Sequence, residues 1–157
     1  MSYEVDQSGK LENTSVPTVV AFSNGSRNYL YLKPVAKRKI QQHFTAIKKP
    51  KSYIYKTFAC LIYLLIKRYK LEGMLVIDIE YPGNMNLIKS HVYRIFKKYE
   101  FKESKVDFRF GLVGKKSRAH EKALTAFRSK KYSRASIVTS SEVLKILIIK
   151  NQALLET

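Results

Sequence analysis

The stretch MLVIDIEYPGN, residues 74 to 84, has the β-branched content of a buried β-strand and is ended by Pro82-Gly83. A nearly apolar segment of helical length precedes it, and an amphipathic segment with apolar residues at helical spacing follows it. We therefore expect a strand over residues 73 to 81, between helices over residues 52 to 69 and 84 to 99. This alternation is typical of a parallel sheet covered by helices.

Upstream of these elements, two β-rich runs over residues 18 to 23 and 28 to 33 flank Asn24-Gly25. Asn-Gly is a strong hairpin signal, because both positions of the tight turn need positive φ. The remaining apolar patterns predict a helix from residue 35, strands over residues 105 to 113 and 134 to 139, and helices beginning near Ser117 and Thr139.

The predicted fold class is therefore α/β, with a mixed sheet that has an N-terminal antiparallel hairpin and βα units, and with helices covering the sheet. Residues 1 to 16 are polar and aperiodic, and we expect them to form a flexible N-terminal segment. Residues 17 to 157 are expected to form a single α/β domain.

The net charge of +18, from 30 Lys+Arg against 12 Asp+Glu, indicates a polyanionic partner. Residues 13 to 71 contain 12 Lys+Arg and no acid, and residues 115 to 134 contain eight Lys+Arg against a single Glu. Nucleic acid is the favoured partner, and an anionic membrane or an acidic protein is the alternative. The residues expected to contact nucleic acid are Lys37, Arg38, Lys39, Lys48, Lys49, Lys51, Lys115, Lys116, Ser117 and Arg118.

Asp78 and Glu80 place two of the few acids in a predicted strand. Residues i and i+2 of a strand share a face, so the two carboxylates are expected about 6–7 Å apart, at the strand end where ligands bind in open α/β sheets. Two explanations stay open. Either nearby Lys or Arg residues neutralise the pair, or it binds Mg²⁺ or Mn²⁺, hard cations that prefer oxygen ligands.

The stretch GLVGKKSRAHE, residues 111 to 121, joins a predicted strand to a predicted helix whose N-cap is Ser117. Glycines and lysines before a helix N-terminus are typical of a phosphate site, although the spacing is too short for a Walker A loop. On the first turn, His120 could protonate a leaving oxygen or contact phosphate. Glu121 completes the candidate catalytic set with Asp78, Glu80 and His120; a surface histidine without a role is the alternative.

The hairpin, the β-α alternation, the acids in VIDIEYPG and the basic GKKSRAHE junction together resemble the ribonuclease H-like superfamily of nucleases and resolvases. The resemblance extends over residues 17 to 150 and implies metal-dependent cleavage of phosphodiesters. Two features depart from it. Such enzymes usually carry an aspartate in the first strand, where this chain reads VVAFSNG, and three strand elements precede their first helix, where we predict two. These departures concern catalysis more than nucleic-acid binding.

The preferred function is therefore nucleic-acid binding with metal-dependent nuclease activity at Asp78 and Glu80. A non-enzymatic DNA- or RNA-binding protein is the first alternative, and an adaptor for an acidic protein is the second. No base-reading motif separates DNA from RNA. No segment reaches the roughly 20 apolar residues of a membrane span. The chain has one cysteine and no pattern of a secretory signal, so an intracellular, cytoplasmic location is expected.

Overall fold

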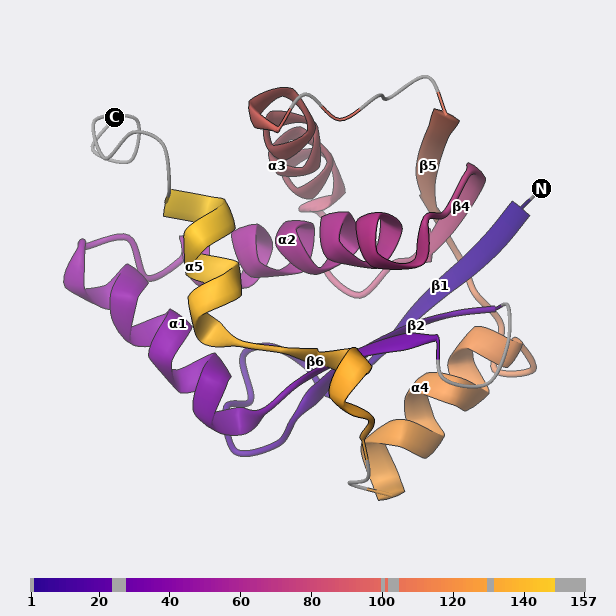
Figure 1. Cartoon of the computed structure of the whole chain (residues 1–157), viewed down its shortest axis with the longest axis horizontal. Coiled ribbons are helices and arrows are strands. Elements are labelled where there is room, and N and C mark those ends of the chain that lie inside the picture. The colour runs from indigo at the N-terminus through magenta and orange to yellow at the C-terminus, as the bar shows by residue number, and fades with distance from the viewer. Residues whose placement is uncertain (1, 24–27, 100, 102–104, 130–131, 149–157) are drawn as a thin grey trace.

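A computed structural model describes residues 2–23, 28–99, 101, 105–129 and 132–148 of the 157-residue chain (Figure 1). Its centre is a six-stranded mixed sheet with strand order β5-β4-β1-β2-β3-β6. The predicted α/β class is confirmed. The strands are β1 (Ser2–Ser8), β2 (Thr18–Phe22), β3 (Tyr29–Leu32), β4 (Gly73–Asp78), β5 (Val106–Gly111) and β6 (Ile137–Val138).

The first three strands form an antiparallel meander, whereas the outer strands run parallel to their neighbours. β2 pairs with β3 in a register that places Val20 opposite Leu30, which confirms the predicted hairpin. The Asn24-Gly25 turn itself lies outside the described residues. β4 pairs in parallel with β1 on one side and with β5 on the other. The carboxyl-terminal ends of these three strands therefore lie at the same end of the sheet.

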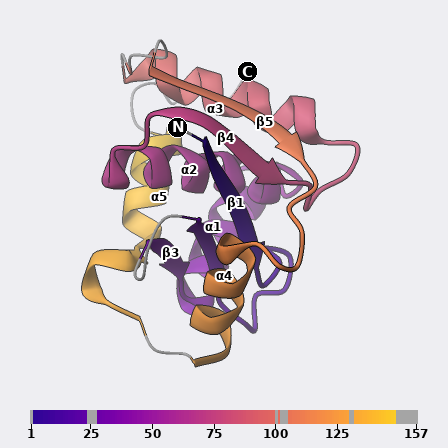
Figure 2. The same cartoon turned by 90° about the vertical axis from the view of Figure 1, so that its right-hand side faces the viewer.

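Helices cover both faces of the sheet, but unevenly (Figures 1 and 2). Along β2, Val20 and Phe22 belong to the large core beneath α1, α2, α3 and α5, whereas Val19 and Ala21 pack against α4 alone. This alternation explains why every residue of β2 is buried, since both of its faces are covered. The helices are α1 (Pro34–Ala46), α2 (Ser52–Tyr69), α3 (Met85–Lys98), α4 (Arg118–Ser129) and α5 (Ser140–Ile148).

The α2 helix is the centre of the larger core. It begins and ends where the apolar pattern predicts, and Cys60, Leu61, Leu64 and Leu65 are all buried. No helix in the described part of the chain is long and apolar enough to cross a membrane.

The expectation of a flexible segment over residues 1 to 16 was wrong. Ser2–Ser8 is β1, which lies inside the sheet between β4 and β2. Tyr3 and Val5 alternate as strand residues should, but the buried Asp6 and Gln7 that follow interrupt the apolar pattern. A central strand that buries polar side chains lacks the signal by which strands are recognised in a sequence.

The connection from β1 to β2 is held in place by Lys37 of α1. The Lys37 Nζ donates hydrogen bonds to the carbonyl oxygens of Lys10, Asn13 and Val16, at 2.7–2.9 Å. The whole residue is inaccessible to solvent. Its assignment as a nucleic-acid contact was therefore wrong, because all three donors of the ammonium group are used inside the protein.

Candidate active site

The parallel pairing of β1 with β4 brings together two aspartates that lie 72 residues apart in the sequence. The register aligns Val5 with Ile77, so the next position places Asp6 beside Asp78. Val5 and Ile77 point into the core beneath α2. By the alternation of strands, Asp6 and Asp78 therefore point to the opposite face, on which α4 lies.

Glu80 joins this pair from the turn that follows β4. The strand ends at Asp78, so the expectation that both acids lie on one strand was wrong, and Glu80 is placed by the turn instead. Its N–H donates to the carbonyl oxygen of Asp78 at 3.1 Å. One carboxylate oxygen from each of Asp6, Asp78 and Glu80 lies within 4.8 Å of the other two.

The three carboxylates have few donors around them. Asp6 Oδ1 accepts from the N–H of Gln7 at 2.8 Å, and Asp78 Oδ1 accepts from the N–H of Val113 at 2.9 Å. Within the described residues, no Lys or Arg nitrogen lies within 4.0 Å of any of the three groups. The explanation that paired Lys or Arg residues neutralise these acids is therefore not supported.

The crowding of negative charge affects the pKa values of Glu80 and Asp6. Burial, together with the nearby charges of Asp6 and Asp78, raises the pKa of Glu80 to about 7, against a smaller opposing effect of Lys10. Burial likewise raises the pKa of Asp6, although its hydrogen bond with His120 lowers it. Without a cation, the cluster reduces its charge by holding a proton.

His120 reaches the cluster from α4. Its Nδ1 lies 2.7 Å from Asp6 Oδ2, while about a third of its side chain is exposed, at 33%. The start of the helix determines the position of the ring. Ser117 Oγ accepts a hydrogen bond from the N–H of Ala119, as predicted for an N-cap. The buried Ala119 and Ala123 pack α4 against the sheet. Ser117 is thus a buried cap and not an exposed phosphate contact.

Glu121 is not brought to the cluster. It is exposed on α4 and is not part of the three-carboxylate group. Its assignment as a catalytic residue was therefore wrong, because one step along a helix turns a side chain by about 100° away from that of His120.

The predicted basic residues divide into two sets. Lys115 and Lys116 are exposed in the connection from β5 to α4, and Arg118 is exposed at the first residue of α4. The N–H of Val113 in this connection donates to Asp78, so this set lies on the side of the acids. The other set lies on α1 and the turn after it, and α1 packs on the face of the sheet opposite α4. It consists of Arg38, Lys39, Lys48, Lys49 and Lys51.

Beyond α4, no helix of the described residues covers the same face of the sheet along β4 and β5 (Figure 2). α4 packs on β1 and β2, and Arg109 of β5 remains exposed. Gly111 is the strand partner of Asp78. The Nη1 atom of Arg109 lies 3.2 Å from the position that a side-chain Cβ would occupy at Gly111, so it stands over this glycine. The guanidinium of Arg109 therefore extends along the strand towards the acids.

Asp6 and Arg109 are the site residues that sequence analysis missed. The only signal for Asp6 was an acid after the Tyr3-x-Val5 alternation, and Arg109 stands in the alternating pattern VDFRFG. No family model matches the chain, and no curated protein or solved structure is significantly similar to it.

Proposed function

We propose that the protein is a metal-dependent nuclease of the ribonuclease H-like type, with its active site at Asp6, Asp78 and Glu80. The observation that carries the proposal is the convergence of three carboxylates without a Lys or Arg counter-ion among the described residues. Clustered carboxylates cost several kcal/mol unless a positive charge compensates them. A divalent cation provides that compensation.

The chemistry of the three groups suits Mg²⁺ or Mn²⁺. Both cations prefer carboxylate oxygens, and Mg²⁺ holds its ligands at about 2.0–2.1 Å. Adjacent ligands of such an octahedral ion are about 3 Å apart and opposite ones about 4.2 Å, so the three carboxylates, now within 4.8 Å of one another, would have to draw together when the cation binds. A cation bound there would polarise a phosphodiester and lower the pKa of water.

The strand arrangement supports the resemblance to the ribonuclease H-like superfamily. Sequence analysis left two departures: an acid absent from the first strand, and two strands in place of three before the first helix. With Ser2–Ser8 as the first strand, three strands precede α1 and the first of them carries Asp6. Both departures disappear.

The charges around the acids fit a nucleic-acid substrate. Lys115, Lys116 and Arg118 on one side and Arg109 on the other offer contacts to phosphates that flank the scissile bond. The uncovered part of the sheet gives a strand room to approach Asp78.

His120 supplies a proton donor in this proposal. Its Nδ1 is bonded to Asp6, so Nε2 is the ring atom left for the substrate, and the imidazolium form would pass its Nε2 proton to the leaving oxygen and become the neutral imidazole. Asp6 thus has two roles, since it is a ligand for the cation and also orients the imidazole.

The test is incubation of the protein with labelled single-stranded and duplex DNA, RNA and RNA–DNA hybrid, in Mg²⁺, Mn²⁺ or EDTA. We expect cleavage that EDTA abolishes. Asp78→Asn should abolish cleavage but preserve or increase affinity, because it removes a negative charge that repels phosphate. The matched control is Glu12→Gln, an exposed acid of the β1–β2 connection outside the carboxylate group, which should cleave as the parent does. Binding without cleavage in any of these conditions would leave the non-enzymatic nucleic-acid-binding function.

A further inference from the structure

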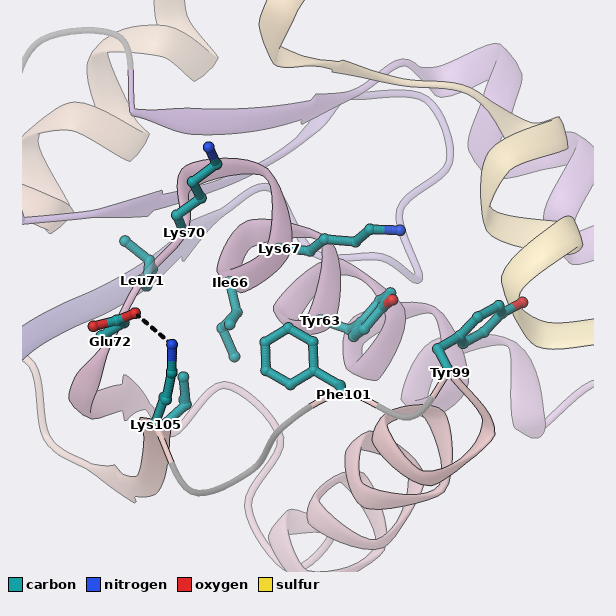
Figure 3. A pocket seen from close by; sticks show the side chains of 10 residues that line it. Tyr63, Ile66, Lys67, Lys70, Leu71, Glu72, Tyr99, Phe101 and Lys105 are labelled. Carbon is teal, nitrogen blue, oxygen red and sulfur yellow. Dashed lines mark ion pairs between the residues drawn. The ribbon is translucent and has the colours of Figure 1, made fainter.

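A pocket of about 490 Å³ opens at the end of the parallel strands opposite the acids (Figure 3). It lies where α2 leads into β4 and where β5 begins. The distance along β4 from Gly73 to Asp78 is about 16 Å, at a rise of about 3.3 Å per residue, so the pocket is separate from the candidate active site. The lining residues that matter for binding include Lys67, Lys70, Glu72, Tyr99, Phe101 and Lys105.

Aromatic rings form one wall of the pocket. Tyr63 and Tyr99 are stacked, with centroids 5.9 Å apart and an interplanar angle of 26°. One face of Phe101 stacks on Phe96, with ring centroids 4.8 Å apart, and Figure 3 shows the Phe101 ring between Lys105 and Tyr63. Tyr63 is buried behind this wall, so the flat apolar surface that a planar ligand can reach belongs to the half-buried Tyr99 and Phe101. Because neighbouring rings hold these two side chains in place, they lose little entropy when a ligand binds.

The rim of the pocket is positively charged. The Lys105 ammonium group forms an ion pair with the Glu72 carboxylate at 3.8 Å, so these two charges offset each other. The net positive charge of the rim therefore comes from Lys67 and Lys70. Neither of these two lysines makes an ion pair with an acid of the described residues, and both are exposed. The Lys67 Nζ lies 5.7 Å from the centre of the Tyr63 ring, so a cation stands directly beside the aromatic wall.

We propose that this pocket binds one nucleotide, with its base on the ring of Phe101 and its phosphate at Lys67 and Lys70. The inference extends the proposed function, because it assigns a second binding position to an unpaired nucleotide of the nucleic-acid strand. A planar base needs an aromatic face and its phosphate needs cations, and sites for single strands combine the two. The volume lies within the range of about 300–1,000 Å³ that is typical of small-molecule sites.

Two variants separate the role of the base from that of the phosphate. Phe101→Leu keeps apolar packing but removes the ring, and should lower the affinity for a hexathymidylate about tenfold. Lys67→Gln combined with Lys70→Gln should make binding less dependent on salt, with a logarithmic slope that is smaller by about 0.7 for each phosphate that the variant no longer binds. The matched controls, Phe110→Leu on β5 and Lys97→Gln on α3, should bind as the parent does.

Photochemical cross-linking shows where the base lies. A hexathymidylate with one 5-iodouracil, irradiated in the complex and mapped by mass spectrometry, should cross-link to Tyr99 or Phe101, and Phe101→Leu should lose or weaken that product. Uridine monophosphate is the second probe. If it prevents the cross-link at micromolar concentration, the ligand is a free nucleotide; if only oligonucleotides do so, the ligand is part of a strand.

The outcomes distinguish this inference from the proposed function. Cross-links found only outside the pocket, with unchanged affinity in both pocket variants, overturn the nucleotide site even where metal-dependent cleavage is observed. Cross-links in the pocket with no cleavage under any metal overturn the nuclease and support the site. The exposed Lys67 and Lys70 can be replaced without disturbing the core, so their result holds even where Phe101→Leu changes the fold.

Discussion

Replacement of Glu80 by Gln should stabilise the metal-free protein at alkaline pH. In that state Glu80 lies among the charges of Asp6 and Asp78 without a Lys or Arg partner in the described structure. Gln has nearly the same shape but no charge to repel its neighbours. A carboxylate held in a structural salt bridge would behave in the opposite way, because its removal leaves a buried cation unpaired.

The sign and size of the effect follow from the pKa of Glu80. Burial and like charge raise this pKa from 4.5 to about 7, so between these values the folded protein holds a proton that the unfolded chain has released. The free energy of unfolding therefore falls as pH rises from about 4.5 to about 7, and is constant above that range. A shift of about 2.5 units at 1.36 kcal/mol per unit corresponds to an upper limit of about 3 kcal/mol.

Urea unfolding followed by circular dichroism in EDTA, between pH 5 and 8.5, measures this difference. At pH 5 the parent and Glu80→Gln should have similar free energies of unfolding, and at pH 8.5 the variant should be more stable. Added Mg²⁺ should stabilise the parent more than the variant. Glu121→Gln is the control, because Glu121 is exposed and lies outside the carboxylate group, and it should change little. A Glu80→Gln variant that is less stable than the parent at pH 8.5 would refute the reasoning.

Three further outcomes are expected. Replacing Lys115, Lys116 and Arg118 together by Gln should weaken binding of all nucleic-acid sequences alike, and should lower the slope of log affinity against log salt by about 0.9 for each duplex phosphate that the variant no longer binds. Titrations at several salt concentrations measure this slope, and an unchanged slope would show that these residues do not contact phosphate. Leu64→Ala in α2 should cost about 2–5 kcal/mol of stability in urea unfolding, because it opens a cavity in the core; a cost below about 1 kcal/mol would contradict the burial of this helix. Lys37→Met should destabilise the protein by at least about 1–3 kcal/mol, because it leaves three carbonyl groups without their donor, whereas the exposed Lys39→Met should not.

Much of this architecture can be predicted from local patterns. The hairpin of β2 and β3, the α2 helix and the β4–α3 unit all follow from apolar residues at the spacing of strands or helices. Ser117 as the cap of α4 and Asp78 at a strand end could be predicted for the same reason. Each depends on neighbours within a few residues of the chain, and those interactions exist before the chain folds.

The candidate active site depends on pairings that no local pattern contains. β1 has a weak apolar pattern because it buries Asp6 and Gln7, and its position inside the sheet depends on partners about 70 residues away in β4. Lys37 looks like any other exposed lysine until the β1–β2 connection closes around its ammonium group. Charge and burial are properties of the folded surroundings, so the same residue type contacts solvent in one helix position and carbonyl oxygens in another. The convergence of Asp6, Asp78 and Glu80 arises for this reason from strand register and not from spacing along the chain.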